Sequence, residues 1–395
     1  MVPVALQDFT LVTCLGAGRK RTIEALQAGA SGLSPCSLPE VHFPTHVGAV
    51  AGLDQPLEGD FAGFDCRNNR LAALALSEDS FAETVAAARE RYGAARVGVF
   101  LGTSTSGLLQ SEDAYRRRDA VTGRLPTDFD YAGTHNTYSL ARFVRAALHL
   151  AGPAFVMSAA CAATAKAVAS GARMIAAGVC DAAVVGGADT LCATTLYGFN
   201  SLGVVAEQPC RPFDAERGGI SIGEAAGFIL LERVQPRGGD ETVLLHGIGE
   251  SADAYHMSSP HPDGVGARLA MERSLASAGL IARDIDYINL HGTATLAGDA
   301  AEDRAVFDLF GPATPCSSTK GFTGHTLGAS GAIEAIFAAL AILNGFTPGS
   351  PHTRTIDPIF RSHYLCASER GRVDRVMSNS FGFAGANCSL VLGRT

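Results

Sequence analysis

One cysteine stands in this 395-residue chain where local structure could make it reactive. Cys161 follows the apolar run GPAFVMSAA and precedes an Ala-rich stretch, so its thiol is predicted at a turn between a buried strand and a helix. The unpaired N–H groups and the dipole of a helix N-terminus favour a thiolate, which is the nucleophilic form. The alternative is that Cys161 is only one of ten cysteines, buried because a free cysteine packs as a small apolar residue.

Two further segments place histidine beside residues that could polarise a substrate. INLHGTATLAGDAAED puts His291 at the C-terminal end of an expected strand, where α/β sheets bind ligands. SSTKGFTGHTLGASG puts Lys320 and His325 in one glycine-rich loop, and the amphipathic helix that follows carries Glu334. Taken singly, each histidine could equally be a satisfied core residue. A phosphate-binding loop is a poor alternative, because the segment does not match G-x-x-x-x-G-K-[ST].

The last segment with a chemical pattern is NSFGFAGAN, residues 379–387. Phe381 and Phe383 alternate with glycines, which let a backbone N–H approach a ligand while the rings form a pocket wall. The alternative is a glycine-rich turn packed by two phenylalanines.

The elements that must position these residues alternate between strands and helices. Continuous apolar runs predict buried strands at 96–107, 152–161, 181–190, 225–234 and 286–295. Helices are predicted at 162–177, 266–279 and 331–344. This alternation indicates an α/β protein with a mostly parallel sheet covered by helices.

A loop near 235–243 divides the chain into two domains with similar patterns. We expect an N-terminal half, 1–240, with the nucleophilic cysteine, and a C-terminal half, 241–395, with the two histidines. The charged segment 108–140 has no strong period, so we expect an excursion from the core that could carry a binding surface.

Composition excludes several classes of protein. Hydrophobic residues make up 47% of the chain, which excludes a disordered protein, and the net charge of −8 argues against nucleic-acid binding. No pair of cysteines has C-x-x-C spacing, so a structural zinc site has little support, and free thiols in a reducing compartment are expected. The N-terminus lacks the basic start of a secretion signal, and no uninterrupted apolar stretch is long enough to span a membrane. We therefore expect a soluble, cytoplasmic protein with no membrane partner.

Taken together, the motifs resemble those of the beta-ketoacyl-acyl-carrier-protein synthases of the elongating type, classes I and II, in the thiolase-like superfamily. The resemblance covers nearly the whole chain and rests on SAACAA, RPFDAERGGISIGEAAG, NLHGTAT, STKGFTGHTLGASG and NSFGFAGAN in this order. It implies a five-layer α-β-α-β-α fold built from two similar α/β halves. It also implies decarboxylative condensation of an acyl-enzyme with malonyl-acyl-carrier protein, with no cofactor and no metal in the catalytic set.

The resemblance assigns roles residue by residue. Cys161 would be the acyl-accepting nucleophile, with His291, His325 and Lys320 as catalytic partners and Glu334 in support. The backbone N–H groups of Cys161 and Phe383 would form the oxyanion hole. The acyl pocket and its gate would be formed by Phe199, Thr105, Phe381 and Phe383. Asn289 and Asn379 fall near a position where some relatives hold a monovalent cation.

Partners follow from the same resemblance. Acyl- and malonyl-loaded acyl carrier protein is expected, and the chain is expected as a homodimer or as a heterodimer with a related subunit. The carrier is acidic in this family, so Arg67 and Arg70 are candidate docking residues, and Arg116, Arg117 and Arg118 form a second candidate cluster. A solvated charged face is the alternative for such clusters.

The chain departs from the family pattern at three places, which favours a specialised synthase, for example one of an aryl-polyene pathway. Ala294 replaces the usual Gly or Ser after HGT. Residues 384–386 read Ala-Gly-Ala where Gly-Gly-Thr is usual. Thr105 lies in GTSTSG, at a position that often limits chain length.

Four rival classes fit less well. A non-catalytic chain-length-factor subunit would lack the nucleophile, and a degradative thiolase would have a second cysteine in a C-terminal C-x-G segment. A starter-type synthase would have only one such histidine. An unrelated Cys–His hydrolase would not carry the full set of motifs.

Overall fold

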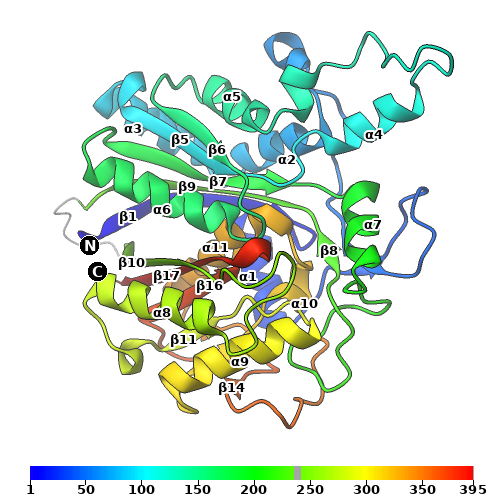
Figure 1. Cartoon of the computed structure of the whole chain (residues 1–395). Helices are drawn as coiled ribbons and strands as arrows, with labels where there is room; N and C mark the ends of the chain where they lie inside the picture. The colour runs from blue at the N-terminus through cyan, green and yellow to red at the C-terminus, as the bar shows by residue number, and fades with distance from the viewer. Residues whose placement is uncertain (235–241, 395) are drawn as a thin grey trace.

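The computed structural model describes residues 1–234 and 242–394 and has five layers of secondary structure (Figure 1). Outer helices cover a first sheet, two central helices separate it from a second sheet, and another pair of helices covers the far side. The predicted five-layer α-β-α-β-α arrangement is confirmed. Residues 240 and 241, which flank the predicted boundary, both lie outside the described residues, so the two-domain division stays a prediction.

The first sheet belongs to the N-terminal part of the chain. Its strands run in the order β1 (Val4–Thr13), β9 (Ala225–Arg233), β7 (Ala182–Asp189), β5 (Val97–Gly102) and β6 (Ala154–Met157). Strands β7, β5 and β6 are parallel, whereas β9 is antiparallel to both of its neighbours. Helices α2 (Arg67–Leu76), α3 (Phe81–Tyr92) and α5 (Tyr138–Ala147) cover its outer face.

The second sheet belongs to the C-terminal part. Its order is β10 (Val243–Ala252), β17 (Ala386–Arg394), β16 (Arg375–Phe381), β11 (Tyr287–Asn289), β12 (Pro315–Ser317) and β14 (His363–Tyr364). Helices α8 (Val265–Ala278) and α9 (Leu296–Phe310) cover it. Three antiparallel pairs of β10 and β1 residues join the two sheets at their edges.

The prediction of a mostly parallel sheet is wrong, because the sheets are mixed. Strands β16 and β17 run antiparallel, since the connection between them is a single turn, η6 (Phe383–Gly385). A parallel pair needs a crossover of a dozen or more residues. The short glycine-rich segment therefore forms a hairpin, and its tip faces the end of β6.

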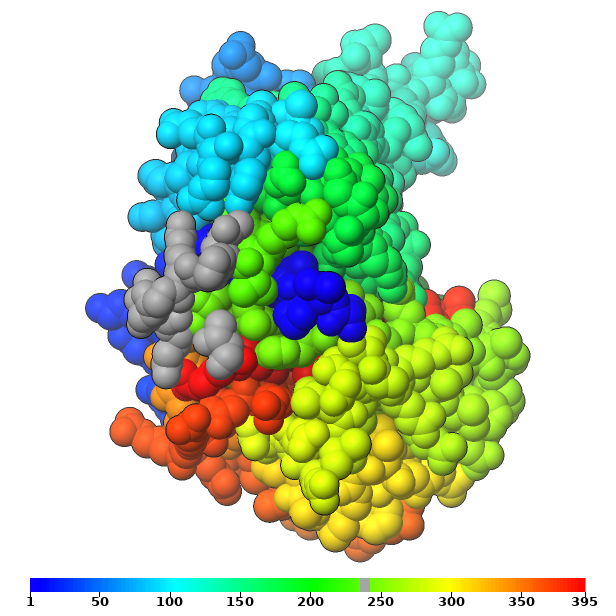
Figure 2. Space-filling model, turned by 90° about the vertical axis from the view of Figure 1, so that its left-hand side faces the viewer, coloured from blue at the N-terminus to red at the C-terminus, as the bar shows by residue number. Residues whose placement is uncertain are grey.

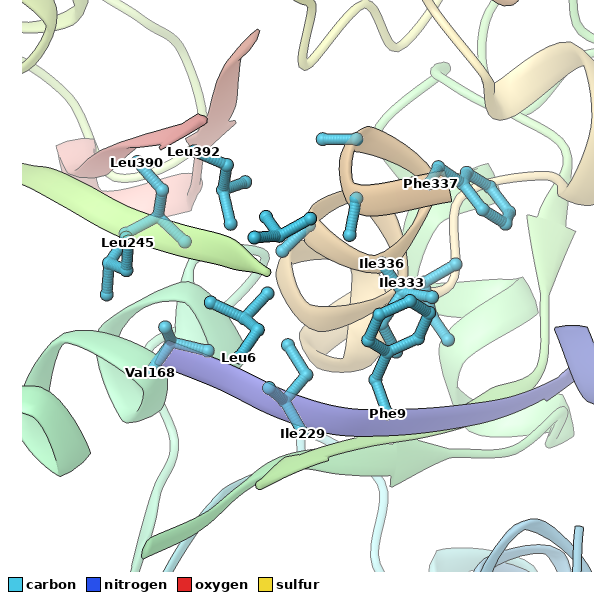
Figure 3. Packing of buried hydrophobic residues seen from close by; sticks show 14 of the residues in the cluster. Leu6, Phe9, Val168, Ile229, Leu245, Ile333, Ile336, Phe337, Leu390 and Leu392 are labelled. Atoms are coloured by element: carbon cyan, nitrogen blue, oxygen red, sulfur yellow. The ribbon is translucent and has the colours of Figure 1, made fainter. Parts of the chain in front are cut away.

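The central layer consists of α6 (Ala163–Ala176) and α11 (Ser330–Asn344). Apolar side chains from both sheets surround α11, including Phe9 and Ile229 on one side and Leu390 and Leu392 on the other (Figure 3). Residues Leu327–Asn344 are long and apolar enough to cross a membrane, but 89% of this window is buried inside the protein. Their hydrophobicity is that of a core helix.

The predicted excursion at 108–140 consists of α4 (Leu108–Arg116), an exposed loop, and a single turn at Tyr131–His135. It exposes the apolar side chains of Tyr115, Val121 and Tyr131. In Figure 1 it projects beyond the upper helices.

The remaining elements are short or peripheral. They are β2 (Gly16–Ala17), α1 (Gly18–Ala28), β3 (Ser34–Pro35), β4 (His46–Gly48), η1 (Gly59–Phe64), η2 (Ala94–Arg96), α7 (Ala193–Ser201), β8 (Ile222–Gly223), η4 (Ala282–Asp284), α10 (Lys320–Thr323), η5 (Leu327–Ala329), β13 (Phe346–Thr347) and β15 (Glu369–Arg370). The first residues of the chain lie at the seam between the halves (Figure 2), where the Met1 amino group donates to the Ser277 carbonyl.

Candidate active site

Cys161 lies at the predicted strand-to-helix turn. Strand β6 ends at Met157 and helix α6 begins at Ala163. The intervening Ala160 has a φ of 49°, the left-handed conformation of a sharp turn, which costs an L-residue about 1–2 kcal/mol. Cys161 is 6% exposed, so the turn presents its thiol to an enclosed space.

Close packing of the two central helices brings the second half of the site to this thiol. A Cβ added at Gly331 on α11 would lie 2.6 Å from the backbone N of Ala165 on α6. Only glycine allows this approach, and the loop that precedes α11 carries His325.

His325 faces Cys161 directly. Its Nε2 lies 3.0 Å from the Cys161 Sγ. The Leu327 N–H donates to His325 Nδ1 at 3.1 Å, and the Ser330 hydroxyl lies 2.9 Å from the same nitrogen. Because Nδ1 accepts the Leu327 N–H, the neutral ring carries its proton on Nε2. The Nε2–H therefore donates toward the sulfur.

His291 comes from the end of β11 and lies beside His325. The ring centroids are 5.3 Å apart in an edge-to-face arrangement. The Glu302 carboxylate accepts the backbone N–H groups of His291 at 2.8 Å and Gly292 at 2.7 Å, which fixes this turn. Lys320 Nζ lies 3.4 Å from His291 Nδ1, so Nδ1 is an acceptor here as well and Nε2–H is the donor.

Both imidazoles are neutral. Burial, followed by the charge of Lys320 and then by His325, lowers the pKa of His291 well below its usual value. Burial and then Lys320 do the same to the pKa of His325. The site therefore holds two uncharged N–H donors at neutral pH.

Lys320 and Glu334 form a buried ion pair behind the histidines. The Lys320 ammonium donates to Glu334 Oε1, and the two side chains are 2% and 4% exposed. Burial raises the pKa of Glu334 to about 7, although the Lys320 charge lowers it. Lys320 Nζ lies between one carboxyl and one imidazole, and as an ammonium it would supply charge but no lone pair.

Burial also controls the nucleophile. Burial raises the pKa of the Cys161 thiol to about 11. The Lys320 charge and the backbone N–H groups of Phe383 and Cys161 lower this pKa, but their combined effect is smaller than that of burial. The free site therefore holds a thiol, and the helix terminus does not by itself produce a resting thiolate. The same two backbone N–H groups face the Cys161 sulfur, and the oxyanion hole assigned to them stays a prediction.

A cavity of about 340 Å³ leads to these groups. Cys161, His291, His325, Phe199, Phe381 and Phe383 line it. The rings of Phe199 and Phe383 meet at 5.6 Å. The structure thus brings together every predicted catalytic residue with three of the four predicted pocket residues.

Thr105 is the exception. It does not line this cavity, because its N–H and hydroxyl both donate to Asp189 Oδ1 at 2.7 Å. Its side chain supports the end of β7 in the described structure.

The predicted docking arginines are also engaged within the chain. Arg67 pairs with the fully buried carboxylate of Glu224 at 2.5 Å, and Arg70 pairs with Asp65 at 2.6 Å. These pairs hold α2 and its neighbouring loops, and because both arginine side chains are still partly exposed, carrier docking there stays a prediction. Arg117 is likewise paired with Asp113 and Asp128.

The site does not fit a metal ion, although one ligand atom from each of Cys161, His291 and His325 lies within 4.8 Å of the others. Ligation through Nε2 would move each imidazole proton to Nδ1. That nitrogen already faces the Leu327 N–H in His325 and the Lys320 ammonium in His291. The tautomers favour N–H donation instead.

The neighbouring polar cluster has one orphaned atom. Asn289 Oδ1 is buried without a partner in the described residues, and Asn379 Nδ2 lies 3.4 Å from Glu302. Asn289 Oδ1 is an oxygen of the kind that can ligate a monovalent cation, whereas the Asn379 Nδ2 amide donates and cannot ligate one. Ser330 and the Leu327 N–H were not predicted as site residues, because no sequence spacing reports a contact to an imidazole nitrogen.

Comparison with known proteins agrees with this geometry. Residues 11–237 match the beta-ketoacyl synthase N-terminal domain and residues 243–354 match the C-terminal domain. The chain belongs to the beta-ketoacyl synthase family. It is therefore a condensing acyltransferase with a thiolase-like α/β fold.

Individual relatives span different lengths. The chain is 32% identical to 3-oxoacyl-[acyl-carrier-protein] synthase 2 of Coxiella burnetii, covering 99% of this chain and 98% of that protein. It is 41% identical to the mitochondrial 3-oxoacyl-[acyl-carrier-protein] synthase of Arabidopsis thaliana over 61% of this chain, which spans 56% of that relative. Among solved structures, the chain is similar to a ketosynthase from Xenorhabdus doucetiae that was solved in complex with its chain length factor. The TM-score is 0.90 and the sequence identity is 37%, and the match covers 99% of this beta-ketoacyl synthase and 98% of that chain.

Proposed function

We propose that this beta-ketoacyl synthase joins an acyl group on Cys161 to a malonyl unit delivered by an acyl carrier protein, with loss of carbon dioxide. The observation that supports this most is the convergence of one thiol and two neutral Nε2–H donors in one cavity. A hydrolase needs a base beside its nucleophile, whereas His325 offers a donor. A condensing site needs donors for two separate oxyanions, and the two Nε2–H groups together with the backbone N–H groups of Cys161 and Phe383 are candidates for these roles.

The first half-reaction moves the acyl group to Cys161. The Cys161 sulfur attacks the carrier thioester, the carbonyl oxygen gains charge, and the N–H groups of Cys161 and Phe383 stabilise it. Collapse of the resulting tetrahedral intermediate releases the carrier thiol, which takes the proton that the Cys161 thiol loses. The His325 Nε2–H favours the sulfur anion during this exchange. Thiolates are both good nucleophiles and good leaving groups, which suits a group that must be passed on.

The second half-reaction makes the carbon–carbon bond. The carbon–carboxylate bond of malonyl-carrier breaks, its electron pair moves to an enolate, and carbon dioxide leaves. We infer that the Nε2–H groups of His291 and His325 hold the enolate oxygen, since Nδ1 of each ring is an acceptor. The enolate carbon attacks the acyl carbonyl on Cys161, and the sulfur departs as a thiolate that then takes a proton from water. The product is a 3-ketoacyl-carrier.

The partners and the setting belong to the same proposal. The carrier delivers both substrates, and we propose that the active form is a dimer with a second ketosynthase-fold chain. Solved relatives that are complexes of a ketosynthase with a chain length factor support a heterodimer. The ten cysteines are free thiols, which supports a reducing, cytoplasmic setting.

A condensation assay with malonyl-carrier and a panel of acyl-carriers tests the proposal. Wild type should form 3-ketoacyl-carrier from at least one acyl donor, and Cys161→Ala should form none. The assay is run with the chain alone and after co-expression with candidate partner subunits. Absence of product from every donor, with and without partners, would refute the proposed reaction.

A further inference from the structure

Helix α7 (Ala193–Ser201) carries Phe199, one half of a ring contact in the cavity that Cys161 also lines, yet the helix has few buried anchors. Only Leu196 among its nine residues is buried. Phe199 meets Phe383 at 5.6 Å between centroids and 46° between ring planes. We call this ring pair the acyl gate. An element with so little buried apolar surface depends on polar contacts to keep its position.

The strongest polar contact at the start of α7 comes from another element. Glu112 on α4 accepts the Thr194 N–H through Oε1 at 2.6 Å and the Ala193 N–H through Oε2 at 3.2 Å. The residue at the N-cap position, Cys192, provides no side-chain cap. The carboxylate therefore satisfies two unpaired donors and places a negative charge at the positive end of the helix dipole. Figure 1 shows α4 directly above α7.

Within the first turn, the Thr195 hydroxyl also donates to the Cys192 carbonyl at 3.0 Å, a contact local to the helix start. The other contacts of α7 with neighbouring elements act elsewhere along it. The Tyr197 hydroxyl donates to the Glu40 carbonyl at 3.0 Å, and its ring meets Phe43 at 5.3 Å. Before the helix, the Leu191 N–H donates to Glu224 at 3.1 Å. None of these contacts holds the first turn. Phe199 lies six residues after Ala193, roughly 9 Å along a rigid helix, so displacement of the first turn moves the gate ring.

We propose that Glu112 is a positioning residue for the acyl gate. Its carboxylate fixes the first turn of α7, and through the helix it keeps Phe199 against Phe383 and the Phe383 N–H beside Cys161. The outlying segment 108–140 thereby sets the access of thioesters to the nucleophile. This inference rests on the proposed function for the role of the gate, but its first test does not require condensation.

The test compares wild type with Glu112→Ala and Glu112→Gln. Iodoacetamide is the probe, and the alkylation rate of each cysteine peptide is followed by mass spectrometry. Glu112→Ala should alkylate Cys161 about fivefold faster, which corresponds to the roughly 1 kcal/mol that a helix cap contributes. Glu112→Gln keeps one acceptor oxygen, so its alkylation rate at Cys161 should lie between those of wild type and Glu112→Ala. Acyl transfer should change in the opposite direction, with a higher KM for the acyl-carrier and a lower kcat.

Two controls separate a gate effect from general loosening. Glu83 lies in the first turn of α3, away from the cavity, so Glu83→Ala should leave the alkylation of Cys161 unchanged. Cys210 is 1% exposed and does not line the cavity, so its peptide should stay unreactive in every variant. An unchanged Cys161 rate in Glu112→Ala, or an equal increase at Cys210, would overturn the proposal. If wild type fails to condense any substrate but these rates change as described, the proposed function fails and the role of Glu112 stands.

Discussion

Removing the charge of Lys320 should slow decarboxylation more than it slows acylation. Lys320 Nζ lies 3.4 Å from His291 Nδ1, so an enolate oxygen bound to Nε2 would lie roughly 8 Å from the ammonium. A unit charge at this distance stabilises the enolate by about 2 kcal/mol at an effective dielectric constant of about 20. Lys320→Met should therefore decarboxylate malonyl-carrier about 30-fold more slowly.

A second substitution separates the electrostatic effect from damage to the fold. Lys320→Met alone leaves Glu334 buried without its partner, and breaking a buried pair this way costs about 3–5 kcal/mol. Lys320→Met/Glu334→Gln removes both charges and keeps similar volumes. Since Lys320 lowers the pKa of the Cys161 thiol and Glu334 raises it, the double variant should recover much of the alkylation rate of Cys161. It should not recover decarboxylation.

The assay measures acetyl-carrier formation from malonyl-carrier, with iodoacetamide alkylation of the Cys161 peptide and the melting temperature measured on the same preparations. A folded double variant that decarboxylates at the wild-type rate would refute the role assigned to the Lys320 charge.

Three further predictions address the nucleophile, the second histidine and the hairpin tip. The alkylation rate of Cys161 should rise about tenfold per pH unit from pH ~7 to ~10, because the pKa of the thiol is about 11 and the thiolate fraction grows as pH rises. A plateau in this rate below pH ~9 would contradict the prediction. Ser330→Ala should lower kcat/KM for condensation about fivefold, because it removes one of the two contacts at His325 Nδ1. The pH–rate profile should show an imidazole pKa closer to neutral pH than in wild type, and an unchanged profile would count against this role. Ala384→Gly should raise the unfolding free energy by about 0.5–1 kcal/mol, because Ala384 has a φ of 59°, a left-handed conformation that strains a residue with a Cβ. A melting temperature below that of wild type would disprove this strain.

Much of the site could be predicted because its residues stand at the ends of recognisable elements. Cys161 at a strand–helix turn and His291 at a strand end follow from apolar runs that stop at small residues. The alternation of such runs with Ala-rich stretches predicted the α/β class, whereas the five layers followed only from the family resemblance. That resemblance rested on several motifs in one order, and it also supplied the role of each site residue.

The rest depends on contacts between distant segments. Arg67 resembles a surface cation in the sequence, but it is paired with Glu224, 157 positions further on. Thr105 is adjacent to the glycine-rich pocket segment in sequence, yet Asp189 holds its side chain. The mixed strand directions also could not be derived from buried runs, because a buried antiparallel strand is as continuously apolar as a parallel one.

The most direct test of the account is whether Cys161 carries the acyl group during turnover. Wild type mixed with an acyl-carrier alone should gain one acyl mass on the peptide that contains Cys161, and addition of malonyl-carrier should remove this mass as 3-ketoacyl-carrier forms. Cys161→Ala should gain no such mass. An acyl group on a different residue, or a Cys161 adduct that malonyl-carrier does not discharge, would contradict the mechanism.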